Sequence, residues 1–219
     1  MTATGVMFVL LLAGGVFGWR AVDAPLEGQS VQFPGWIILP ALAAFALVLV
    51  GTFKPTTARI VGPIYAVLEG IFLGAISHAY ELRYEGLVVQ AIGATAAVFA
   101  AMWFLYATRI IKVTDKFRRV IVGATMGIAL FYGVALIMRL FGAEAPFINS
   151  PSGLGIGFSV LVVGVAAFNL MLDFDMIEKG TEAGLPKHME WFCAMGLMVT
   201  IVWLYLEILR LLAKLQSRD

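Results

Sequence analysis

Acidic side chains interrupt long apolar runs at three places in the sequence, and these residues could do chemistry. The run ending in LMLDFDMIEKG, residues 170–180, holds Asp173 and Asp175. Glu69 lies nine residues into an earlier run, and Glu207 lies deep in the last one. A carboxylate in hydrocarbon is costly, so such residues face a bundle interior or a water path and bind protons or cations. The acids therefore predict a proton or ion site.

Helical geometry separates the two neighbouring aspartates. Residues 173 and 175 lie about 200° apart around a helix, so they point in opposite directions. Asn169 precedes Asp173 by four residues and shares its face, which predicts a polar stripe turned into the bundle. Asp175 instead shares a face with Glu178 and Lys179, a pattern typical of a solvated helix end. We predict that Asp173 is buried and that Asp175 reaches water.

The last apolar run carries small, polar and charged residues along one seam, at spacings of 3, 4, 3, 4 and 3. The seam consists of Cys193, Gly196, Thr200, Trp203, Glu207 and Arg210. Such a seam is poorly suited to lipid, so we place this helix at the centre of the bundle or against it. Glu207 and Arg210 are three residues apart, which predicts a local ion pair. The alternative makes Glu207 part of an ion path.

The composition is that of an integral membrane protein. The 219 residues are 61% apolar and 13% charged, and the mean hydropathy is +0.94. Soluble domains carry about 25% charged residues. The net charge of +1 gives no sign of a nucleic-acid partner, and the single Cys193 excludes an intramolecular disulfide. The sequence lacks a nucleotide-binding loop, G-x-S-x-G and H-E-x-x-H, so we expect neither an enzyme nor a cofactor.

Seven apolar runs have the length that a membrane-spanning helix needs, about 20 residues. The connections between them are short, so we expect one membrane domain over residues 1–219. The predicted fold is an all-α membrane protein of seven transmembrane helices with the last helix central. The predicted spans are 2–19, 34–53, 60–80, 87–107, 119–141, 153–173 and 188–213.

Glycines one turn apart mark places where helices can approach closely. Gly70 and Gly74 form one such pair, and Gly123 and Gly127 form another. We predict that both pairs lie at helix–helix contacts.

Lys and Arg in the connections predict the orientation in the membrane. Nine of the fifteen basic residues fall on one side and six on the other. The connection 108–119 is the most basic, so it is expected in the cytoplasm together with 174–187. The N-terminus is then cytoplasmic and the C-terminus is outside.

Seven spans, the LMLDFDMIEKG ending of the sixth and the LYLEILRLLAKL ending of the last resemble the Bax inhibitor-1 family, also called the transmembrane Bax inhibitor motif family. The similarity covers essentially the whole chain and is greatest to the bacterial branch. It implies a seven-helix fold wrapped around the last helix, placed in the bacterial inner membrane. It also implies a pH-sensitive calcium leak.

The resemblance further implies a gate near the cytosolic side, where aspartates of the sixth and seventh helices pair and their protonation sets the open or closed state. Asp173 matches the first aspartate, whereas Thr200 stands where the second is expected. Two close carboxylates share a proton, whereas a threonine hydroxyl would donate a hydrogen bond to an ionised Asp173 and so displace, weaken or remove the gate. Glu69 and Glu190 are substitute partners for Asp173, and Glu207, seven residues beyond Thr200, is a poorer one.

Two functions from different classes follow. The first is a calcium leak gated by protonation at Asp173, with Asn169 and Glu69 on the path, because calcium prefers carboxylate and carbonyl oxygens. The resemblance implies a basic partner for the acids, for which Lys54 and Arg59 are candidates. The second is a non-transporting regulator that binds a membrane protease or another membrane partner. An intramembrane enzyme is least favoured, since the sequence lacks convergent His and acid ligands.

Overall fold

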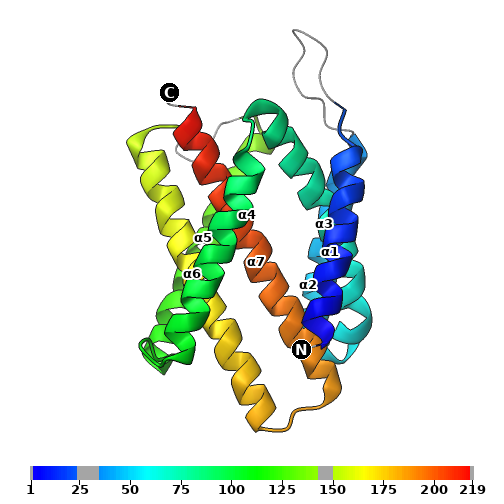
Figure 1. Cartoon of the computed structure of the whole chain (residues 1–219), viewed down its shortest axis with the longest axis vertical. Helices are drawn as coiled ribbons and strands as arrows, with labels where there is room; N and C mark the ends of the chain where they lie inside the picture. The colour runs from blue at the N-terminus through cyan, green and yellow to red at the C-terminus, as the bar shows by residue number, and fades with distance from the viewer. Residues whose placement is uncertain (1, 24–34, 143–149, 218–219) are drawn as a thin grey trace. The chain divides into compact units, whose positions relative to one another are not determined.

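A computed structural model describes residues 2–23, 35–142 and 150–217, and the regular structure in these ranges is entirely helical (Figure 1). Residue 34, the predicted start of the second span, and Arg218, one of the basic residues counted for orientation, lie outside these ranges. The helices are α1 (Thr2–Arg20), α2 (Ile38–Phe53), α3 (Ala58–Arg83), α4 (Leu87–Ala107), α5 (Asp115–Leu140), α6 (Gly153–Glu182) and α7 (Lys187–Gln216). Two 3-10 turns, η1 (Gly35–Ile37) and η2 (Pro55–Thr57), precede α2 and α3.

Within the described ranges, seven helical segments are long and apolar enough to cross a membrane. This confirms the predicted all-α membrane class and its seven spans. In the most apolar 18-residue stretch of each segment, 67% of α7 is buried by the rest of the protein, compared with 17% to 44% of the others. The last helix therefore has the largest buried share, and its central position in the bundle stays a prediction.

The sixth helix is longer than predicted, because it continues to Glu182 and not only to residue 173. At about 1.5 Å per residue, its 30 residues extend roughly 45 Å, which exceeds the hydrocarbon thickness of about 30 Å. It ends where Gly184 adopts a φ of 62°, a conformation that favours glycine, and Pro186 follows. Asp173 and Asp175 therefore lie inside a helix and not at its end.

The fifth helix begins at Asp115, four residues before the predicted start. The Thr114 side-chain oxygen accepts the Phe117 backbone N–H at 3.2 Å, as helix-capping residues do. The two connections predicted to be cytoplasmic are consequently shorter, and they cover 108–114 and 183–186.

The chain divides into two compact units, each described by itself. The first unit contains Met1–Val88 and Met176–Val202, and the second contains Val89–Asp175 and Trp203–Asp219. Both α6 and α7 contribute residues to each unit. The single domain expected over residues 1–219 stays a prediction.

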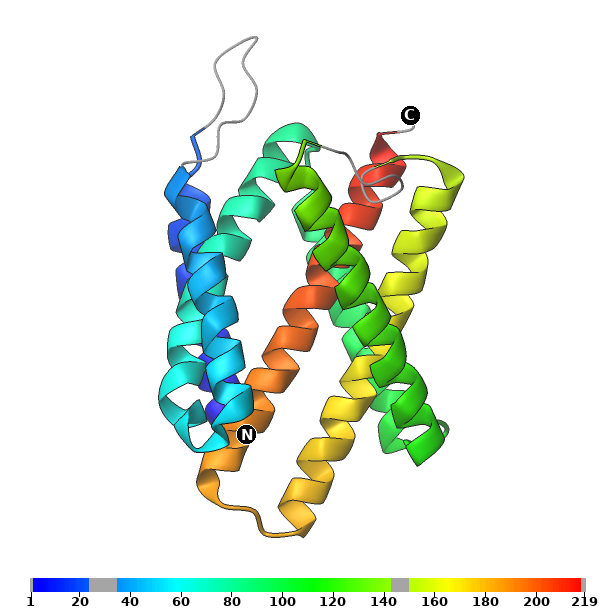
Figure 2. The ribbon, with the colours of Figure 1, turned by 180° about the vertical axis from the view of Figure 1, so that it is seen from behind.

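In the first unit, α3 packs against α1 and α2, as Figures 1 and 2 show from opposite sides. The backbones of α1 and α3 touch at glycines. A Cβ atom on Gly18 would come closer than 3.0 Å to the backbone of Ile71, and one on Gly74 would meet the backbone of Gly15 in the same way. Gly70 meets the backbone of α1 too, so the predicted contact at Gly70 and Gly74 is confirmed.

The second glycine pair does not pack. A Cβ atom on Gly123 or Gly127 would meet no atom of the described residues within 4 Å, and both glycines are exposed. The prediction of a helix contact there is wrong, because spacing places two small residues on one face without specifying what that face meets.

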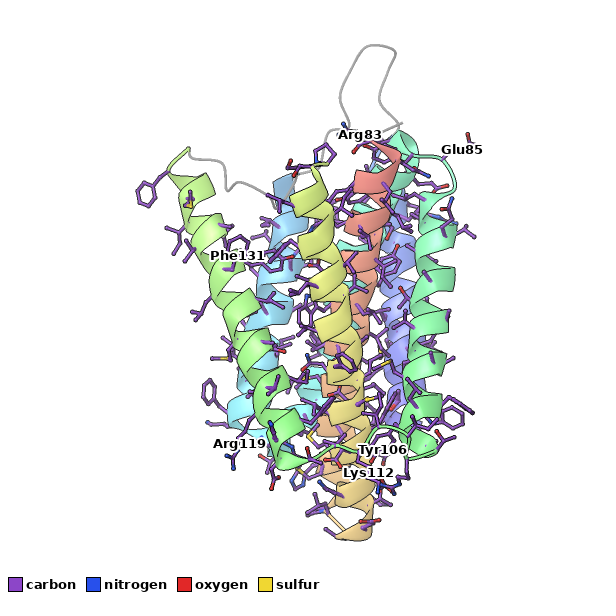
Figure 3. All side chains as sticks on the ribbon, turned by 90° about the vertical axis from the view of Figure 1, so that its left-hand side faces the viewer. Arg83, Glu85, Tyr106, Lys112, Arg119 and Phe131 are labelled. Atoms are coloured by element: carbon purple, nitrogen blue, oxygen red, sulfur yellow. The ribbon has the colours of Figure 1, made fainter. Side chains whose placement is uncertain are left out.

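In the second unit, aromatic rings join the helices. Phe174 of α6 contacts Phe99 and Tyr106 of α4 with ring centroids 5.5 and 5.8 Å apart. Figure 3 shows Tyr106 at the same end of this unit as Lys112 and Arg119, with Phe131 in the opposite half of α5. The basic connection 108–114 therefore lies at the end of the unit where α5 begins.

We expect Gly18→Ala and Gly74→Ala to destabilise the protein, because each new methyl group would collide with a backbone that cannot rotate away. Overpacking of this kind costs about 1–3 kcal/mol, measurable as a lower thermal midpoint in detergent. Gly127→Ala is the matched control. It should leave the midpoint unchanged or slightly higher, since alanine is the better helix former. Equal losses at Gly74 and Gly127 would contradict the assigned contact.

Candidate functional site

Asp175 is buried and paired, which corrects the prediction that it reaches water. Its side chain is 8% exposed, and Oδ2 accepts a hydrogen bond from Nη2 of Arg118 at 2.5 Å. Arg118 lies in the first turn of α5 and is 47% exposed, so its guanidinium reaches both the acid and the surface. The prediction failed because α6 continues past this point and Asp175 faces α5.

Asp173 is half-buried on α6, and its Oδ2 atom has no contact with solvent. Asn169, one turn earlier, donates from Nδ2 to the Thr125 hydroxyl at 2.8 Å and to the carbonyl of Val165 at 2.9 Å. Half of the predicted stripe thus has a defined partner on α5. An acid sheltered from solvent beside a fixed amide is a place where a proton or a cation can be held.

A line of three polar residues on α5 was missed from the sequence. Arg118, Thr125 and Tyr132 recur every seven residues, and this spacing places them on one face. Arg118 pairs with α6, Thr125 with α6 and Tyr132 with α7. The heptad spacing was a readable signal, although spacing alone does not identify the partners.

The predicted ion pair between Glu207 and Arg210 is present, with Nη1 of Arg210 2.6 Å from Oε1 of Glu207. Glu207 is 2% exposed. The Tyr132 hydroxyl donates to the same Oε1 at 2.8 Å and accepts a hydrogen bond from Arg210 at 2.8 Å. The Arg210 guanidinium also lies over the Tyr132 ring, 5.2 Å from its centroid. The three side chains therefore form a closed triangle between α5 and α7.

Lys214 is a buried cation of α7 in this unit, and sequence reasoning did not single it out. It is 5% exposed. Its Nζ donates to the Gly155 carbonyl at 2.9 Å and to the Ser159 hydroxyl at 2.8 Å, both on α6. Lys214 follows Glu207 by seven residues, so the seam identified in the sequence extends one turn beyond Arg210.

The remaining predicted acids and Thr200 lie in the first unit. Thr200 is buried, and its hydroxyl donates to the Gly196 carbonyl at 3.2 Å. Glu69 is half-buried on α3. Glu190 is exposed at the start of α7, and its carboxylate accepts the backbone N–H of Ala3 at 3.3 Å. Because Asp173 belongs to the second unit, its pairing with any of these residues stays a prediction.

The two basic residues suggested as partners for the acids are exposed. Lys54 follows α2 directly, and Arg59 lies in the first turn of α3, both in the first unit. In the second unit, the basic residue that pairs with an acid of α6 is Arg118, which contacts Asp175. A role for Lys54 or Arg59 stays a prediction.

Glu190 also lines a pocket of about 500 Å³ in the first unit. Thr2 and Thr4 of α1, Thr181 of α6 and Cys193 of α7 contribute to its wall. Over the described ranges, His, Cys, Asp and Glu side chains nowhere gather in groups of three that could hold a metal ion.

A comparison with family models gives a match over residues 1–217, to the family described as Bax inhibitor 1 like. The matched residues include α1 to α7 and thus both units. No curated protein and no solved structure matches the chain.

The ion pair between Arg118 and Asp175 makes an asymmetric prediction for stability. Arg118→Gln leaves a buried carboxylate without its cation, whereas Asp175→Asn leaves a half-exposed guanidinium that water can solvate. We expect Arg118→Gln to cost about 1–3 kcal/mol in thermal unfolding, and Asp175→Asn to cost less. The double variant should be more stable than Arg118→Gln alone. Arg119→Gln, at the exposed neighbour, is the control, and the reverse order of the single variants would refute the assignment.

Proposed function

Because the chain belongs to the Bax inhibitor 1 like family of membrane proteins, we propose that it is a slow calcium leak whose gate is the protonation state of Asp173. The proposed setting is a bacterial inner membrane, with the N-terminus in the cytoplasm and the C-terminus outside. The observation that carries the proposal is the position of Asp173 on α6, with Oδ2 shielded from solvent one turn after Asn169.

Burial gives the proton on this acid a large effect. A charged carboxylate inside a membrane protein must be compensated by polar neighbours, whereas the protonated acid is tolerated by apolar ones. Gaining or losing one proton therefore changes which arrangement of neighbouring helices is stable. Protonation of an acid in free contact with water would not have this effect on helix packing, because water solvates either form.

The chemistry of the ligands supports calcium as the ion. Calcium binds oxygen atoms of carboxylates, amides and backbone carbonyls in flexible geometries. Asp173, Asn169 and Glu69 supply such oxygens on helices that cross the membrane. A passing ion needs only transient contact with each of them, so single acids suffice where a resident metal would need a cluster.

We expect Asp173→Asn to make calcium flux into dye-loaded liposomes the same at acidic and at neutral pH, while the parent protein responds to pH. The amide keeps the shape of the side chain but cannot exchange a proton. Glu182→Gln, an exposed acid at the end of the same helix, is the matched control and should keep the parent's response.

Two results would count against the proposal. If Asp173→Asn responds to pH as the parent does, then the gate is elsewhere. If the parent passes no more calcium than protein-free liposomes and co-purifies with a membrane protein, then a non-transporting regulator is the better description.

A further inference from the structure

The triangle of Tyr132, Glu207 and Arg210 leaves one polar atom without a partner. Oε1 of Glu207 accepts both hydrogen bonds, while Oε2 is buried and accepts none from the residues that the structure describes. A carboxylate that served only as a structural anchor would be expected to use both oxygens, since a buried acceptor left unpaired is costly. Oε2 is thus a place where a mobile cation or its water can bind.

The surroundings of Glu207 are nevertheless positive. Arg210 and Lys214 lie three and seven residues further along α7, on the same face. With Glu207 ionised, the three groups carry one net positive charge. A cation approaching Oε2 is therefore opposed by the cluster that contains it.

The cluster also lies at a definite place in the second unit. Asp173 and Ser159, the acceptor for Lys214, belong to one seam of α6 spaced by 4, 3, 4, 3 and 4 residues. The seam consists of Gly155, Ser159, Val162, Ala166, Asn169 and Asp173. Val162 and Ala166, each 0% exposed, separate its two polar ends. Ser159 and Asp173 are fourteen positions apart, a distance of about 21 Å along the helix.

We propose that Arg210 is an electrostatic brake on cation passage, acting on Glu207 in the charged cluster whose third member, Lys214, contacts the end of the α6 seam opposite Asp173. This inference rests on the proposed function and adds a residue that determines its rate and selectivity. Arg210 is the partner able to move, because its side chain is 30% exposed while that of Glu207 is 2% exposed. When the guanidinium withdraws, both oxygens of Glu207 become available to a cation.

The test measures calcium flux in liposomes for variants that change the net charge of the cluster formed by Glu207, Arg210 and Lys214. Arg210→Gln lowers the net charge to zero and should raise the flux by about fivefold or more, as expected for one unit charge at contact distance. Glu207→Gln raises the charge to two and should lower the flux by a similar factor. Arg210→Lys keeps a cation beside Glu207 and should change the flux least. The double variant Glu207→Gln with Arg210→Gln restores the parent's net charge but lacks the carboxylate, so its flux should lie between those of the two single variants.

The order of these fluxes distinguishes an electrostatic brake from an ion pair with a purely structural role. Loss of a structural pair would change both single variants in the same direction, with the double variant no closer to the parent than either. Single variants that change together, or not at all, overturn the inference while the parent's own calcium flux upholds the proposed function. If Arg210→Gln fails to fold, the comparison of Glu207→Gln with the double variant still decides, since restoring the net charge should raise the flux above that of Glu207→Gln.

A second readout does not depend on flux. Val162→Cys, in a Cys193→Ser background, places one thiol in the apolar middle of the seam. A positively charged methanethiosulfonate reagent should label it slowly in the parent and at least about fivefold faster with Arg210→Gln, because the loss of one positive charge reduces the repulsion of a cationic probe. Equal labelling would overturn the inference. Faster labelling in a protein that passes no calcium would uphold the brake and refute the leak.

Discussion

A polar side chain inside hydrocarbon needs a hydrogen-bonding partner, and in the second unit the partners that lie on another helix hold the helices in place. Three residues of α5, Arg118, Thr125 and Tyr132, each meet such a partner on α6 or α7. Because they lie on one face over about 21 Å, they fix the rotation and the axial register of α5 together. Apolar packing alone would leave both loosely defined, since lipid tails compete with side chains for the same contacts.

In the first unit, the helices pack in the same hydrocarbon environment through close backbone contacts. The backbones of α1 and α3 touch at glycines, so dispersion forces and close approach replace hydrogen bonds between side chains. The ring of Trp19 stacks on His78 at 4.6 Å near one end of this contact. The two units therefore differ in how many substitutions their contacts tolerate. A polar pair tolerates few, and a glycine contact tolerates almost none.

Much of the fold was readable from the sequence because the governing rule is local. Twenty apolar residues predict a span wherever they occur, and the Glu207–Arg210 pair follows from spacing within one helix. The burial of Asp175 was not readable, since it depends on Arg118, 57 positions away in the chain. The prediction of a helix contact at Gly123 and Gly127 was wrong for the same reason. Periodicity specifies a face, and only the neighbouring helices decide what covers it.

The two aspartates of α6 impose a mechanical restriction. Asp175 is tied to α5, whereas Asp173 points to a different side of the same turn. Axial rotation of α6 that carried Asp173 to new surroundings would pull Asp175 from Arg118 and leave a buried charge exposed to apolar contacts. Any response to protonation at Asp173 must therefore be taken up by bending of α6 or by displacement of the neighbouring helices, and not by rotation of α6 about its own axis.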